Sequence, residues 1–118
     1  MSESIVGKKS FELAVNIITI YKKLVADKKE FVLSKQILRS ETPVGANIRE
    51  ALNGQSKRDF IHNLSISQKE CDETIYWLEL LFTTEYISKE EFEDVRNQAS
   101  EILKIIRSII LTTKSKNL

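Results

Sequence analysis

Residues 60–81 carry the feature that most constrains the fold, an unbroken alternation of four- and three-residue steps between apolar or small side chains. The positions are Phe60, Leu64, Ser67, Cys71, Thr74, Leu78 and Leu81. This heptad spacing keeps all seven on one face of an α-helix, and it is typical of the contacts between helices in four-helix bundles. Because small residues occupy its middle, we expect another helix to approach closely there.

Apolar residues at helical spacing continue along the rest of the chain. They predict helices over about residues 10–26, 31–53, 57–86 and 89–113. The last helix begins at a complete capping box, Ser88 to Glu91, which is the clearest boundary in the sequence. Four helices with short connections predict an all-α fold, an antiparallel up-down four-helix bundle, in a single domain over residues 1–118. Residues 1–8 show little pattern, and we expect them to fray.

The first helix carries an apolar arc that is broader than contact with one neighbour requires. One face combines Phe11, Ala14, Val15, Ile18, Tyr21, Leu24 and Val25, and the arc is widened by Leu13, Ile17 and Ile20. Such an arc indicates contact with more than one neighbour. Exposed on a monomer, it would promote association, so we expect a homo-oligomer.

The second helix contains the only proline of the chain, Pro43, within apolar helical spacing that runs from Leu33 to Leu52. A proline inside a helix removes one backbone hydrogen bond and costs about 3 kcal/mol. Two alternatives remain open: a continuous helix kinked at Pro43, or a helix that restarts with Thr42 as its cap and Pro43 at its first position.

Composition excludes several protein classes. Three glycines and one proline in 118 residues disfavour turn-rich β folds. The single cysteine, Cys71, cannot form an internal disulfide, and the N-terminus does not resemble a signal peptide. No apolar run approaches the ~20 residues that span a bilayer. We therefore expect a cytoplasmic protein without a membrane segment.

The charge is nearly balanced over the whole chain, at +1, but not over its halves. Residues 1–59 hold 11 Lys/Arg against 7 Asp/Glu, a net charge of +4, and residues 60–118 hold 7 against 10, a net charge of −3. Four basic residues of the first half, Lys35, Arg39, Lys57 and Arg58, are candidates for phosphate contact. The alternative is a set of ordinary solvated helix faces.

Residues for catalysis or metal binding are scarce. One histidine, His62, and one cysteine cannot form the usual zinc sites, and the Glu-x-x-His pairs of di-iron bundles do not occur. Glu70 and Glu73 have the spacing of an acid–base pair, but no substrate pocket is indicated beside them. We therefore expect that the protein is not an enzyme and binds no cofactor. We expect His62 to lie at the rim of the helix contact and Cys71 to lie in the core.

A second polar set surrounds Pro43. Asn47 and Arg49 lie where backbone carbonyls freed by the proline need donors, and Glu70 and Glu73 are candidates to face Arg49 across the bundle. A partly buried Arg–Glu pair would set the register between helices without adding much stability. A role in register, a role at a subunit interface and a ligand site all remain open.

Three segments together resemble a known family. Gln36-Ile-Leu-Arg39, then Pro43-x-x-x-Asn47-Ile48-x-Glu50, then Lys69-Glu70-x-x-Glu73-Thr74-x-x-Trp77-Leu78 resemble the bacterial four-helix bundle proteins. Members of that family are often encoded in intervening sequences of large-subunit ribosomal RNA genes, and some are labelled ribosomal proteins. The resemblance covers residues 10–114. It marks Pro43, Asn47, Arg49, Glu50, Glu70, Glu73 and Trp77 as residues of the family pattern.

The resemblance implies an antiparallel four-helix bundle that assembles into a ring-like homopentamer. Similar proteins include the accessory variability protein of diversity-generating retroelements, a basic pentamer that binds a reverse transcriptase and nucleic acid. This chain differs in having Ala51 where many members have glycine, and in a net charge of only +1. We therefore expect an oligomeric scaffold with a protein or nucleoprotein partner. The alternative is an RNA-binding module whose basic residues are repeated around the oligomer.

Overall fold

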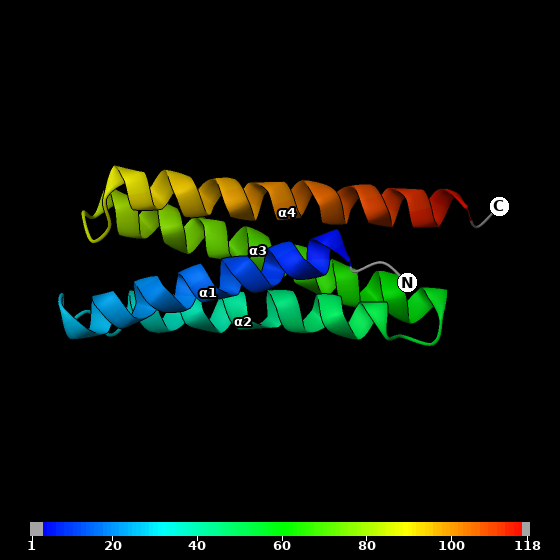
Figure 1. The fold of residues 1–118 in the computed structure, drawn as a ribbon, viewed down its shortest axis with the longest axis horizontal. Helices are drawn as coiled ribbons and strands as arrows, with labels where there is room; N and C mark the ends of the chain where they lie inside the picture. Colours follow the sequence, from blue (N-terminus) through cyan, green and yellow to red (C-terminus); the bar gives the residue numbers. More distant parts are fainter. Residues whose placement is uncertain (1–3, 117–118) are drawn as a thin grey trace.

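The chain folds into four helices that run alternately up and down (Figure 1). A computed structural model describes residues 4–116. The helices are α1 (Ile5–Ala26), α2 (Leu33–Leu52), α3 (Lys57–Thr83) and α4 (Lys89–Ser115). α2 packs against α1 and α3, and α4 packs against α3 and α1, so each helix contacts two neighbours around the bundle. The predicted all-α, antiparallel four-helix bundle is confirmed.

The first helix begins earlier than the sequence pattern indicates. It starts at Ile5 rather than near residue 10, because the Ser4 side chain accepts a hydrogen bond from the Gly7 backbone N–H at 3.0 Å. Such an N-cap satisfies one of the free donors of the first turn. The predicted fraying of residues 1–8 is therefore wrong for residues 5–8, and residues 1–3 lie outside the described part.

The second helix passes through Pro43 without interruption, so the restart at Thr42 is wrong. The Asn47 side-chain amide donates to the backbone carbonyl of Pro43 at 2.8 Å. The carbonyl that the proline deprives of its helical donor is that of Arg39, one turn earlier. Asn47 thus stabilises the helix next to the proline, but it does not replace the lost bond.

The N-cap residue of α2, Val32, has no side-chain group that could cap the helix. Glu30, in the loop before α2, caps it instead. Its carboxylate accepts hydrogen bonds from the backbone N–H groups of Val32, Leu33 and Ser34 at 3.0, 2.8 and 2.7 Å. Burial by itself would raise the pKa of Glu30, but these bonds outweigh it and the pKa is lowered. The ionised carboxylate therefore fixes the start of α2 against its positive end.

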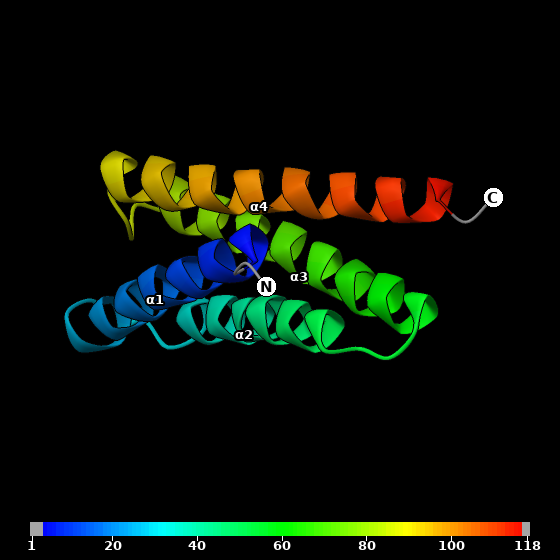
Figure 2. The ribbon, with the colours of Figure 1, turned by 45° about the vertical axis from the view of Figure 1, so that its right-hand side comes forward.

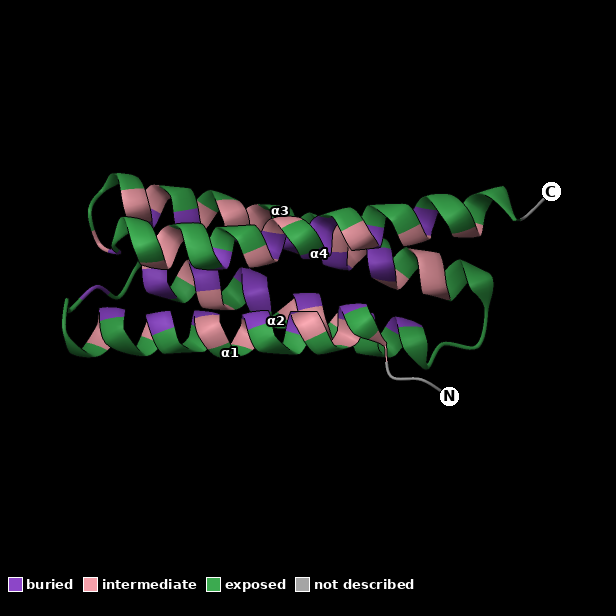
Figure 3. Ribbon diagram, turned by 45° about the horizontal axis from the view of Figure 1, so that its top comes forward, coloured by how far each residue is buried: buried purple, intermediate pink, exposed green. Residues whose placement is uncertain are grey.

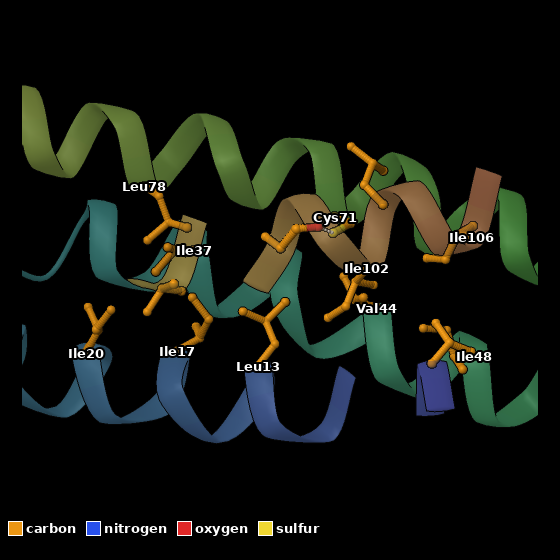
Figure 4. Packing of buried hydrophobic residues seen from close by; sticks show 14 of the residues in the cluster. Leu13, Ile17, Ile20, Ile37, Val44, Ile48, Cys71, Leu78, Ile102 and Ile106 are labelled. Atoms are coloured by element: carbon orange, nitrogen blue, oxygen red, sulfur yellow. Dashed lines mark hydrogen bonds between the residues drawn. The ribbon is translucent and has the colours of Figure 1, made fainter. Parts of the chain in front are cut away.

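The core is a continuous line of apolar side chains from all four helices (Figure 4), and the buried positions along the ribbons are seen in Figure 3. The predicted heptad face of α3 is buried from Leu64 to Leu81, and Phe60 at its end is half-buried. On α2, Ala51 is buried and Leu52 is exposed, so the expectation that Leu52 belongs to the apolar face is wrong. Adjacent residues of a helix point 100° apart, which is enough to place Ala51 in the core and Leu52 in solvent.

α1 has two apolar faces, of which only one enters the core. The buried face consists of Val6, Leu13, Ile17, Ile20 and Leu24. The opposite face, which we call the outer face of α1, consists of Phe11, Val15 and Ile18, which are 61%, 48% and 38% exposed. The three residues that only widened the predicted arc, Leu13, Ile17 and Ile20, all lie in the core. Of the face named first, Leu24 is buried, but its three residues on the outer face of α1 point outward.

Candidate functional site

Residues of the family pattern meet on the surface between α2 and α3. Arg39 of α2 forms an ion pair with Glu73 of α3, and the Trp77 indole N–H donates to the same carboxylate at 3.0 Å. The hydrogen bond from Trp77, followed by that from Arg39, lowers the pKa of Glu73. The carboxylate is therefore held ionised as a bridge between the two helices, and no proton is available from it near neutral pH.

Below this bridge, hydroxyl groups join the two helices inside the core. The hydroxyls of Ser40 and Thr74 lie 2.9 Å apart, and Thr74 also donates to the Glu70 backbone carbonyl at 2.9 Å. The Ser67 hydroxyl donates to the Val44 carbonyl at 2.7 Å. These small side chains allow the close approach that the α3 pattern predicts, and each buried hydroxyl has a partner.

Glu41 breaks that rule. Its side chain is fully buried, at 0% exposure, and neither carboxylate oxygen has a hydrogen-bond partner among the described residues. Burial raises its pKa from 4.5 to about 8, and no charged neighbour contributes to the shift. Sequence analysis missed this residue. The sequence does contain an indication of it: the helical spacing from Ile37 to Val44 predicts an apolar residue at position 41, and a glutamate occurs there.

The charge of Glu41 also acts on the thiol of Cys71 in α3. Burial, followed by the charge of Glu41, raises the pKa of its thiol to about 12. The thiol donates to the Ala99 carbonyl of α4 at 3.4 Å (Figure 4). Cys71 is therefore a small core residue, as predicted, and its thiol is too weakly acidic to act as a nucleophile.

The predicted pairing of Arg49 is wrong. Arg49 lies exposed in the last turn of α2, and the arginine that reaches Glu73 is Arg39, almost three turns earlier. Because α2 and α3 are antiparallel, residues late in α2 face the beginning of α3, far from Glu73. Glu70 is half-buried and one of its carboxylate oxygens has no partner among residues 4–116, while Glu50 is exposed.

The four predicted phosphate-binding residues do not form one patch on a protomer. Lys35 and Arg39 lie in the first two turns of α2, whereas Lys57 and Arg58 begin α3, beyond the other end of α2. Lys35 and Leu52 alone are separated by about 25 Å of helix. Arg39 is further engaged by Glu73 and by Gln36. Any combined action of the four requires a ligand that spans the length of α2, or residues from several copies.

Chemistry-bearing groups do not converge elsewhere in residues 4–116. His62 is exposed, and no three His, Cys, Asp or Glu side chains of this part are placed to hold a metal ion. A hollow of about 350 Å³ lies between the end of α1 and the α3–α4 loop, beside the ion pair of Lys23 with Glu91 at 2.7 Å. Lys23, followed by the Ser88 backbone, lowers the pKa of Glu91, which completes the capping box of α4.

No helix of the described residues is both long and apolar enough to cross a membrane. Arg39 and Glu73 thus join α2 to α3, whereas Arg49 and Glu50 of the family pattern are exposed, and the surface carries the remaining candidates for function.

Comparison with known proteins agrees with this architecture. The family model described as 23S rRNA-intervening sequence protein matches residues 2–108. A similar solved structure is a protein of unknown function from the S23 ribosomal protein family of Bacteroides thetaiotaomicron. It is 57% identical, with a TM-score of 0.88 over 90% of this chain and 98% of that one. No functionally curated protein matches.

Proposed function

We propose, since this chain belongs to the family of 23S rRNA-intervening sequence proteins, that it is a non-enzymatic scaffold. It associates with copies of itself and presents the assembled surface to a protein or nucleoprotein partner in the cytoplasm. The observation that carries this proposal is the outer face of α1. Phe11, Val15 and Ile18 lie one turn apart on a single ridge, and all three are exposed on the protomer.

Isolated exposed apolar residues are common on soluble proteins, but an aligned set including a phenylalanine is typical of contact surfaces. The core does not need these residues, because the opposite side of α1 already supplies the buried face. The bundle also lacks a polar pocket with convergent acid, base or nucleophile groups within residues 4–116, so its surface is the part available for function. The homopentamer implied by the family resemblance is the assembly that we propose.

The test is the mass of the full-length protein in solution, measured by light scattering after size exclusion. We expect a particle five times the mass of the 13.6 kDa chain. Ile18→Glu and Phe11→Glu place a charge on the outer face of α1 and should give monomers that keep their helical circular dichroism. The matched control is Leu111→Glu on α4, where the side chain is also exposed, at 70%, but lies off this face.

Two results would contradict the proposal. One is a wild-type monomer at high micromolar concentration. The other is an oligomer that both outer-face variants leave unchanged, which would place the interface elsewhere.

A further inference from the structure

A groove of about 340 Å³ lies between α3 and α4. The two helices diverge toward the C-terminus of α4, as Figures 1 and 2 show from two directions. α3 lines the groove with Ser65, Gln68, Lys69 and Asp72, which recur at helical steps and share one face. α4 lines it with Arg107 and Lys114, two turns apart. None of these residues belongs to the predicted basic set, and only Lys69 and Asp72 lie within a family pattern segment.

The charges in this groove are unbalanced. Among residues 4–116, three cationic side chains line the groove, and Asp72 is the one carboxylate that does so. The ion pairs of the described residues are Lys9–Glu101, Lys23–Glu91 and Arg39–Glu73, so the groove cations are not neutralised by a carboxylate at contact distance. All three are exposed and bear their charge toward solvent. An anion that enters the groove therefore does not have to displace an internal partner.

We propose that this groove binds linked phosphate groups. Arg107 and Lys114 start two helical turns apart, about 10 Å along α4, so the cationic side chains are spread along the groove rather than gathered at one point. A guanidinium binds two phosphate oxygens at once, and ammonium groups act as point charges. Ser65 and Gln68 add neutral hydrogen-bond donors on the α3 side of the groove. The matching chemistry is a row of at least two phosphates, as in a single-stranded RNA backbone or a nucleotide diphosphate.

The groove lies within one protomer, so this inference does not depend on self-association. Its test uses the full chain and fluorescence anisotropy with a labelled oligouridylate, with pyrophosphate as competitor and, in a second arm, as the ligand in calorimetry. We expect Arg107→Gln to weaken binding about fivefold, the effect of one charge near a phosphate in water. Asp72→Asn should strengthen binding by a similar factor. With three contacts to a single strand, log K should fall with log salt at a slope of about −2.

The controls change net charge equally at the other end of α4. Lys89→Gln and Asp94→Asn lie near its N-terminus, outside the groove, and should leave the affinity within twofold. Binding of RNA that responds to both groove variants supports a backbone ligand. Binding of pyrophosphate alone with the same response supports a nucleotide. Absence of binding in both arms at low salt, or binding indifferent to Arg107→Gln and Asp72→Asn, overturns the inference.

Discussion

Replacing the buried carboxyl of Glu41 should change how the stability of the bundle depends on pH. The folded protein keeps Glu41 protonated up to a pKa of about 8, while the unfolded chain releases the proton near 4.5. Between these values the folded state binds more protons than the unfolded state, so the free energy of unfolding falls as pH rises. Below the unfolded pKa the group has no such effect, and above the folded pKa the loss is complete.

The magnitude follows from the shift. About 3.5 pKa units at 1.36 kcal/mol each give a loss of at most about 5 kcal/mol between pH 4.5 and pH 8. A domain of this size has about 5–15 kcal/mol of stability in total, so this one side chain should dominate the change in stability between pH 4.5 and pH 8. Glu41→Gln keeps the size and the buried polar group but cannot ionise, and it should flatten the profile.

The assay is urea unfolding followed by circular dichroism at pH 5, 7 and 9, at one fixed protein concentration because association adds to stability. We expect the variant to match the wild type near pH 5 and to exceed it by several kcal/mol at pH 9. Glu50→Gln, an exposed substitution on the same helix, is the control. A wild-type profile that is flat from pH 5 to pH 9, or an equally steep profile for Glu41→Gln, would refute the reasoning.

Three further predictions follow from the observed contacts. Ser88→Ala removes the capping box of α4 and should lower the free energy of unfolding by about 1 kcal/mol, with Ser108→Ala, at an exposed position of the same helix, as comparison. Arg49→Ala should change the free energy of unfolding by less than about 0.5 kcal/mol, because Arg49 is exposed and forms none of the ion pairs among the described residues. A larger loss, measured by urea unfolding, would support the structural role that the sequence predicted. Neutralising Lys35, Lys57 and Arg58 together tests the predicted RNA contact, with RNA affinity measured across a salt series. If these residues touch phosphate, the affinity should fall and the slope of log K against log salt should become shallower. An unchanged series would exclude these residues from RNA contact.

Features that depend on neighbouring residues in the chain were predictable. The capping box at Ser88 and Glu91 formed as expected, because its partners lie three residues apart and need no other helix. The heptad face of α3 is buried because every member points the same way from one helix, whichever neighbour covers it. The bundle itself follows from four such amphipathic segments with short connections.

Features that depend on the rotation and register of one helix against another were not predictable. Arg39 rather than Arg49 reaches Glu73, because the antiparallel offset of α2 and α3 decides which turns are adjacent. The periodicity of α1 shows two apolar faces, but only packing decides that Leu13 and Ile17 enter the core while Phe11 stays outside.

Periodicity along the chain thus determined the helices, their caps and the class of the fold, since these arise from contacts within one or two turns. The tertiary structure decided which acidic group is left without partners in the interior, and which basic groups gather in a groove. Burial and charge at a point depend on all the helices around it, and their mutual orientation is set by packing the whole core at once.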